Sequence, residues 1–249
     1  MRIRDGIALG SSRTEQETLE MATRFLPTVD VFEPLSTGDS QQLCERLSHI
    51  CLKAGEIFYA PDDYSEKLYI LCKGRVRVYK TSNGREFTLA VLDSGTVFGE
   101  MTFTARRQQR AYAEAVQPSE IAVVSRKDFE HLIMNKPEVG LQMMSLLSER
   151  LRCYETRLED VALKSVPARL ASLILLLLES EGIVAGKNLL KIPTHYTHRQ
   201  LGTMIGANRA AVTKAFAKLQ DQGIIELKRR LIHVVDLRLL RRAAMDRVY

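Results

Sequence analysis

Between residues 31 and 125 the chain alternates short apolar runs with polar turn sequences. The runs are rich in β-branched and aromatic residues and comprise Ile57–Ala60, Leu68–Cys72, Val76–Lys80, Phe87–Val91 and Ile121–Val124. Asn83-Gly84 separates two of them, and such a pair between strand-like runs is the strongest short-range signal for a β-hairpin. Many short strands at close spacing predict an antiparallel barrel or jelly roll. Residues 1–30 show little periodicity, and we expect a frayed extension there with one short helix.

A regular apolar seam follows the strand-rich region. Pro137 suits the first turn of a helix. Six residues then recur at intervals of three and four: Met144, Leu147, Leu151, Tyr154, Leu158 and Val161. One interpretation is a helix packed on its own domain. A heptad seam this regular, with charged residues on the other faces, favours a parallel two-stranded contact between two copies of the chain.

The last third of the chain has a helical pattern. Ala168–Glu179 carries an apolar core face. Thr197-His198-Arg199-Gln200 is a capping box that begins a short helix, and Gly206-Ala207-Asn208 makes a tight turn before a second helix. Two short helices across a glycine-containing turn predict a helix-turn-helix.

A hairpin pattern follows this second helix. Gly223 ends the helix, Ile224–Leu227 and Leu231–Val235 have the pattern of strands, and Lys228-Arg229-Arg230 lies at the tip between them. Helix, turn, helix and hairpin in this order predict a winged helix-turn-helix, which is a DNA-binding motif.

The charge distribution supports a nucleic-acid partner. The 249 residues carry a net charge of +6. Residues 165–249 hold 14 Lys and Arg against 6 Asp and Glu, whereas the residues before them hold 22 against 24. A near-neutral part joined to a basic part indicates that the C-terminal part binds a polyanion. The longest apolar run, Leu173–Leu178, is far shorter than the roughly 20 residues that span a membrane, and we find no signal-peptide pattern. We therefore expect a cytoplasmic protein with no membrane partner.

The candidate DNA-contacting residues lie in the helix-turn-helix and its wing. Asn208 caps the second helix, whose first outward residues are Arg209, Ala210, Thr213 and Lys214. In a major groove Arg209 can fork onto guanine O6 and N7, and Thr213 can touch a thymine methyl or a base edge. Five further residues are placed to hold phosphates without reading sequence: Thr197, His198, Arg199, Arg229 and Arg230. For His198, Arg209 and Lys214 the alternative is a solvated surface side chain.

A second group of candidate residues lies in the strand-rich region. Phe98-Gly99-Glu100-Met101-Thr102-Phe103 is followed, ten residues after the glutamate, by Arg110-Ala111. This stretch resembles the phosphate-binding cassette of cyclic-nucleotide-binding domains. The order of strands, cassette, long helix and winged helix-turn-helix resembles the bacterial cyclic-AMP receptor and fumarate–nitrate regulator superfamily over about residues 30–242.

The resemblance implies an effector site centred on Gly99, Glu100, Met101, Arg110 and Ala111. Gly99 lets the backbone approach closely, and the short helix after it points N–H groups at an anion. Arg110 supplies a charge-assisted fork for a cyclic phosphate, and Glu100 accepts a hydrogen bond from the ribose 2′-hydroxyl. The alternative roles are a structural turn for Gly99 and a surface ion pair for Arg110.

The sequence departs from the pattern of the family in three places. Ala111 stands where cyclic-AMP sensors usually have Ser or Thr. Tyr154 and Glu155 stand, by counting from the helix-opening proline, where the long helix of cyclic-AMP receptors has the Thr-Ser pair that contacts adenine. Arg209-Ala210-Ala211 replaces the Arg-Glu-Thr of many members. The effector is thus left open between cyclic AMP, another cyclic nucleotide and a different small molecule.

We therefore expect an α+β protein in four parts: an N-terminal extension (1–30), an effector-binding jelly-roll domain (31–136), a dimerisation helix (137–163) and a winged helix-turn-helix DNA-binding domain (164–249). The expected function is a homodimeric, sequence-specific transcription regulator that binds a pseudo-palindromic double-stranded DNA site under the control of a small effector. RNA polymerase is a candidate further partner. A ligand-independent, constitutive regulator is the alternative. We find no nucleophile–base pair, Walker loop or metal-ligand motif in the sequence, so we expect neither an enzyme nor a bound metal.

Overall fold

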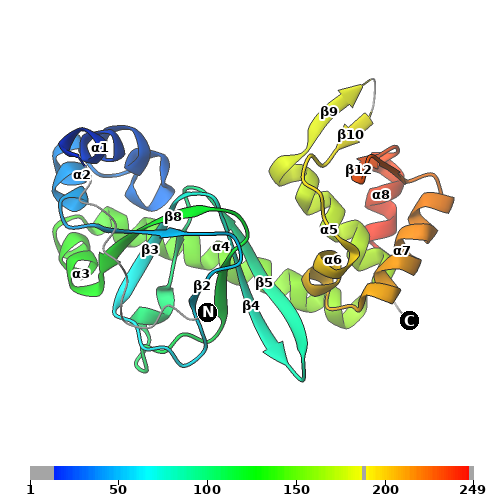
Figure 1. The fold of residues 1–249 in the computed structure, drawn as a ribbon, viewed down its shortest axis with the longest axis horizontal. Coiled ribbons are helices and arrows are strands. Elements are labelled where there is room, and N and C mark those ends of the chain that lie inside the picture. Colours follow the sequence, from blue (N-terminus) through cyan, green and yellow to red (C-terminus); the bar gives the residue numbers. More distant parts are fainter. Residues whose placement is uncertain (1–13, 187–188, 247–249) are drawn as a thin grey trace. The chain divides into compact units, whose positions relative to one another are not determined.

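The computed structural model describes residues 14–186 and 189–246. These residues divide into two compact units (Figure 1). The first unit holds the chain up to residue 80 together with 89–151, and the second holds 81–88 and the chain from 152 onward. The boundary falls inside a long helix, so that helix contributes residues to both units.

The first unit is built on two four-stranded sheets with the antiparallel pairing that the strand-rich pattern predicts. One sheet has the strand order β1–β8–β3–β6 and the other β2–β7–β4–β5. Neighbours such as β1 and β8 are far apart in the sequence, as in a jelly roll. The strands are β1 (Ser48–Leu52), β2 (Ile57–Tyr59), β3 (Lys67–Lys73), β4 (Arg75–Ser82), β5 (Arg85–Asp93), β6 (Val97–Phe98), β7 (Tyr112–Ala115) and β8 (Ser119–Ser125).

Short helices of the first unit gather at one end of the β1–β8–β3–β6 sheet (Figure 1). They are α1 (Glu15–Glu20), η1 (Met21–Phe25), η2 (Leu26–Thr28), η3 (Asp30–Phe32), α2 (Thr37–Cys44) and α3 (Arg126–Asn135). Strand β3 contributes to two cores, because Leu68 and Ile70 pack with these helices whereas Tyr69 and Leu71 pack in the core between the sheets. Burial on both faces explains why the sequence of β3 is an unbroken apolar run.

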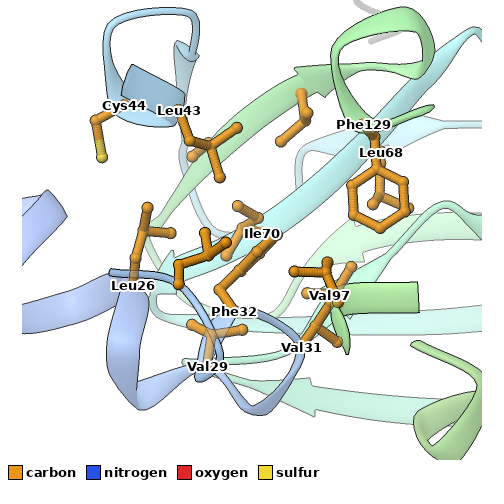
Figure 2. Packing of buried hydrophobic residues seen from close by; sticks show 14 of the residues in the cluster. Leu26, Val29, Val31, Phe32, Leu43, Cys44, Leu68, Ile70, Val97 and Phe129 are labelled. Atoms are coloured by element: carbon orange, nitrogen blue, oxygen red, sulfur yellow. The ribbon is translucent and has the colours of Figure 1, made fainter. Parts of the chain in front are cut away.

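The N-terminal segment forms part of this core, which the sequence analysis did not predict. Leu26, Val29 and Phe32 pack with Ile70 of β3 (Figure 2), and each of the three is at most 1% exposed. The expectation of a frayed extension through residue 30 is therefore wrong from Met21 onward, although its short helix is present as α1. Short α-, π- and 3₁₀-helical turns follow one another here, and they share no single period that a sequence pattern could reveal. Residues 1–13 lie outside the described part of the chain.

Asn83 and Gly84 form the turn between β4 and β5, as predicted. Their φ angles are 48° and 73°, and two positive angles are what a type I′ hairpin turn requires. The turn belongs to the second unit, in which Arg157 binds the backbone of β5. Nη2 of Arg157 donates to the backbone carbonyls of Thr88 at 2.8 Å and of Met204 at 2.7 Å. Burial lowers the pKa of Arg157. The side chain nevertheless stays protonated, because arginine is not deprotonated inside proteins.

Helix α4 runs without a break from Pro137 to Leu163. Its first turns bury Val139 and Met143 in the core of the first unit. The six seam residues, in contrast, are all exposed, from 37% for Leu147 to 71% for Leu158. The first of the two interpretations was that the seam packs on its own domain. The exposure of these large apolar side chains counts against it.

In its described residues the second unit contains four further helices and one sheet with the order β11–β12–β10–β9. Its elements are α5 (Val166–Glu181), β9 (Ile183–Gly186), β10 (Leu189–Lys191), α6 (His198–Ile205), α7 (Arg209–Asp221), β11 (Ile225–Lys228), β12 (Leu231–Val234) and α8 (Leu237–Ala244). The predicted wing is the β11–β12 hairpin, and β9, β10 and α8 were not predicted. No helix in the described ranges is both long enough and apolar enough to span a membrane.

Side-chain caps fix the helix ends in the second unit. Ser165 caps α5, Thr197 and Gln200 form the predicted capping box of α6, and Asn208 caps α7. Gly206 has a φ of 66° and reverses the chain between α6 and α7. The helices enclose a core that includes Ile174, Leu201 and Phe216. The helix-turn-helix is therefore specified by local capping chemistry together with one shared core.

Candidate functional site

Gly99 begins the cassette, between β6 and the one-turn helix η4 (Glu100–Phe103). Its φ of 89° lies in the left-handed region that favours glycine. A Cβ atom at this position would lie 2.4 Å from Cδ2 of Tyr69. The ring of Tyr69 thus packs directly on the backbone, so the glycine has a structural reason as well as the predicted functional one. Because η4 has only four residues, its dipole is smaller than that of a full helix.

Glu100 forms an ion pair with Arg150 of α4. Nη1 of Arg150 donates to Oε2 of Glu100 at 2.9 Å, and Nη2 of the same side chain donates to the backbone carbonyl of Val97. Both charged side chains are largely shielded, with exposed fractions of 18% for Arg150 and 22% for Glu100. Arg150 could not be predicted from the sequence, because it lies 50 positions from its partner and belongs to no motif. The contact joins the cassette to the helix that carries the seam.

Arg110 is exposed, and no hydrogen bond or ion pair joins it to the described part of the chain. The residue before it, Gln109, is 2% exposed and is held through its backbone by Asp62 and Asp63 at 2.9 Å each. The residue after it, Ala111, is buried. A guanidinium without a partner therefore projects from a segment whose backbone is fixed on both sides, which is the arrangement that an anion-binding arginine needs. The surface ion pair considered as its alternative role is not formed with any residue that the structure describes.

The far end of η4 is held by Arg126 of α3, a second residue that sequence analysis missed. Nη1 of Arg126 donates to the backbone carbonyl of Thr102 at 3.0 Å, and its guanidinium lies over the ring of Phe103. Thr102 is fully buried. Met101 is half-buried between these contacts. The cassette is thus fixed by arginines from two different helices, α4 and α3.

The outward face of α7 presents the predicted DNA-contacting residues. Arg209, Ala210, Thr213 and Lys214 are all exposed, and Asn208 is occupied as the cap, with Oδ1 accepting from the backbone N–H of Ala211 at 2.8 Å. On the wing, Arg229 and Arg230 are exposed and have φ angles of 51° and 64°, which place them in the turn between β11 and β12. Arg209, Lys214, Arg229 and Arg230 are thus exposed cations at the helix-turn-helix and the wing.

The three residues that begin α6 have different surroundings. Thr197 uses its hydroxyl in the capping box. Arg199 is 78% exposed and lies 4.0 Å from Glu86. His198 is half-buried: its ring stacks on Phe216, and its Nδ1 lies 2.9 Å from Oγ1 of Thr213. Burial, together with the positive charge of Arg209, lowers the pKa of His198. The phosphate contacts expected for these residues stay predictions.

Tyr154 and Glu155 follow Arg150 by about one turn of α4, and both are exposed. Tyr154 is also a seam residue. Their expected place beside an effector base stays a prediction. No cluster of three or more His, Cys, Asp or Glu side chains suited to a metal ion occurs among the residues that the structure describes.

Two family models match the chain over the two sites just described. The Cyclic nucleotide-binding domain matches residues 49–136, and the Crp-like helix-turn-helix domain matches residues 168–243. Together with the jelly roll and the winged helix-turn-helix, these matches define a DNA-binding regulator with an effector-binding domain.

Known proteins show the same arrangement along their length. The chain is 31% identical over 189 residues to the cyclic AMP receptor protein of Thermus thermophilus, covering 76% of this chain and 83% of that protein. It is 26% identical over 221 residues to the CRP-like cAMP-activated global transcriptional regulator of Mycobacterium tuberculosis, covering 88% and 98%. The structure of a CooA mutant from Carboxydothermus hydrogenoformans shares the fold, with a TM-score of 0.71, 22% identity and coverage of 80% and 88%.

The chain belongs to the CRP/FNR family of transcription regulators. The resemblance found in the sequence and the predicted fold class are both confirmed. The family function is effector-controlled, sequence-specific DNA binding. The relatives named here are transcription regulators and not enzymes.

Proposed function

We propose that this chain is a homodimeric transcription regulator whose affinity for DNA is set by a cyclic nucleotide bound at the cassette. The observation that carries the proposal is Arg110, an exposed guanidinium that has no hydrogen bond or ion pair with the described residues and projects from a fixed segment of the matched cyclic-nucleotide-binding domain. A planar guanidinium suits the two oxygens of a cyclic phosphate. Relatives that are named for cyclic AMP support this effector class.

The dimer is proposed from the exposed seam of α4. Two copies of the helix, in parallel, would bury the seam residues against each other as knobs into holes. A monomer leaves this continuous row of large apolar side chains exposed to water, and dimerisation would bury it. A two-fold dimer presents two copies of α7, and we infer that they read the two halves of a pseudo-palindromic site. The half-site centres would lie about 10–10.5 bp apart or a multiple of this spacing.

Coupling between effector and DNA is proposed to run through Glu100 and Arg150. A ribose hydroxyl that donates to Glu100 changes the environment of the pair with Arg150, and Arg150 lies in the middle of the seam-bearing helix. The ligand then favours the dimer arrangement in which it binds more tightly, and the equilibrium shifts by its differential affinity for the two arrangements.

The test is ligand-induced stabilisation of the full chain. Thermal unfolding is measured with cyclic AMP, cyclic GMP and 2-oxoglutarate for the wild type, Arg110→Ala and Arg106→Ala. Arg106 is a matched control, because it is also exposed and has no hydrogen bond or ion pair with the described residues. A cyclic nucleotide at 100 times its Kd stabilises the wild type by about 2.7 kcal/mol. We expect this stabilisation in the wild type and Arg106→Ala, and its loss in Arg110→Ala.

Other outcomes decide between the alternatives. Stabilisation by 2-oxoglutarate alone would replace the cyclic nucleotide with a different small effector. A wild type that no cyclic nucleotide stabilises at millimolar concentration would contradict the proposal, and DNA binding without any addition would then favour a constitutive regulator. Stabilisation that persists in Arg110→Ala would place the ligand away from the cassette arginine.

A further inference from the structure

We propose that His198 is a positioning residue for DNA recognition. It holds the hydroxyl of Thr213 against the protein, so that α7 meets the base pair with the methyl group of Thr213 and selects a thymine. This inference rests on the DNA-binding function and adds to it the chemistry of one specificity-determining contact. Sequence alone left two roles open for Thr213, a methyl contact or a hydrogen bond to a base edge.

The hydrogen-bond geometry of Thr213 carries the argument. Oγ1 lies 2.9 Å from the backbone carbonyl of Arg209, one turn earlier on α7, and 2.9 Å from Nδ1 of His198 on α6. A hydroxyl has one proton and two lone pairs. With the carbonyl and the imidazole on its protein side, the hydroxyl is engaged by two groups of the helix-turn-helix itself. Thr213 is nevertheless exposed, and the other substituent on its Cβ atom is the methyl group.

His198 selects one of two side-chain orientations. Threonine in a helix divides between two χ1 rotamers, because its hydroxyl can bond to the preceding turn. The hydrogen bond to Nδ1 favours the rotamer that faces α6. The imidazole is itself held in place, since its ring stacks on Phe216 with centroids 5.0 Å apart and an angle of 21° between the planes. Phe216 is 2% exposed and belongs to the core of the second unit.

The neighbours of Thr213 on α7 support an apolar contact. Ala210 lies three positions before it and Ala217 four positions after it, and both are exposed. Positions at this spacing share one face of a helix. Three methyl groups therefore form a narrow apolar strip, with the cations Arg209 and Lys214 beside it. In the major groove the C5-methyl of thymine is the group that favours such a surface.

The experiment removes the methyl group from the DNA. The probe is the duplex that the wild-type protein selects from random DNA, and each thymine is replaced in turn by deoxyuridine, which lacks only the C5-methyl. We expect one thymine in each half-site whose replacement weakens binding of the wild type about fourfold, which is the effect on affinity of burying one methyl group. Thr213→Ser, which keeps the hydroxyl, should lose this discrimination, and Thr213→Val, which keeps the methyl, should retain it.

The role of His198 is tested by His198→Phe, which keeps a ring on Phe216 and removes the hydrogen bond. We expect the thymine-to-uracil ratio at this position to fall toward one, because the orientation of the Thr213 side chain is then no longer fixed. His195→Phe is the matched control, since His195 is exposed three residues earlier. If His198→Phe kept the same thymine-to-uracil affinity ratio as the wild type, the positioning role would be overturned. A wild type indifferent to every thymine would overturn the methyl contact, and a wild type that selects no site at all would overturn sequence-specific DNA binding itself.

Discussion

Arg150 and Glu100 link the seam-bearing helix to the cassette: Nη1 of Arg150 donates to the glutamate at 2.9 Å, and its Nη2 donates to the carbonyl of Val97. One guanidinium thereby holds both the first residue of β6 and the first residue of η4. Because both side chains are more than three-quarters shielded from solvent, this pair is not equivalent to an exposed surface salt bridge.

Breaking this pair should reveal energetic coupling. In a double-mutant cycle with Glu100→Gln and Arg150→Gln, we expect a coupling free energy of about 1.5–3 kcal/mol in the unfolding of the ligand-free protein, as for hydrogen bonds to charged groups. Urea unfolding followed by circular dichroism provides the measurement. If the two substitutions were simply additive, the contact would carry no energy and the proposed route from cassette to α4 would fail.

The seam on α4 should control oligomeric state. Leu151→Glu places two like charges against each other at the centre of the proposed dimer contact, and we expect monomers in light scattering together with lost DNA binding. Leu176→Glu on α5 is the control, since Leu176 is similarly exposed, at 54% against 59% for Leu151, but lies outside the seam. A wild-type protein that is monomeric at micromolar concentration would refute the dimer.

Arginines at the two DNA-facing positions should act differently. Arg209→Ala should weaken binding by about 1–3 kcal/mol per half-site and relax the choice of one base, because a fork onto guanine is lost. Arg229→Ala on the wing should weaken all sequences alike and reduce the slope of log affinity against log salt by about one unit. Selection from random DNA and a salt titration check the two effects. An unchanged selected half-site in Arg209→Ala would show that α7 does not read this base.

The local motifs of the second unit could be predicted from the sequence, and the reason is physical. A capping box or an N-cap acts over three residues, so Thr197, Gln200 and Asn208 specify their helix ends wherever the rest of the chain lies. The turn at Asn83 and Gly84 is local in the same sense. The predicted strands of the first unit were correct in position and generally too short, because strand ends depend on partners across the sheet.

Contacts between distant residues could not be predicted. Arg150 meets Glu100 across 50 positions, and His198 meets Thr213 across 15, from one helix to the next. Nothing periodic marks these pairs. Strand β7 was not predicted, because the small alternating residues around Ala113 give too weak a strand pattern. Its alanines are buried in the core between the two sheets. The candidate site was thus predicted as a set of segments, whereas its positioning residues needed the structure.

The stability of the second unit should depend on pH through His198. Burial and the charge of Arg209 lower its pKa in the folded state, whereas in the unfolded chain the value is about 6.5. The stability contributed by the neutral imidazole is therefore fully present above about pH 6.5 and is lost as the pH falls through the folded-state pKa. Thermal unfolding between pH 7.5 and 5 should show a shallower dependence in His198→Phe than in the wild type. Identical pH dependences would contradict this assignment.

The N-terminal segment that packs into the first core also constrains how the protein is made. Met21 and Met143 share one hydrophobic cluster although about 120 residues separate them along the chain. At a synthesis rate of about 5–20 residues per second, the segment leaves the ribosome about 6–24 seconds before the start of α4 can cover it. Leu26, Val29 and Phe32 can meet Ile70 of β3 earlier in that interval, but the cluster lacks Val139 and Met143 until α4 emerges. The first unit can therefore complete its core only when the helix that carries the seam begins to emerge, so that folding of this unit and appearance of the seam are coupled in time.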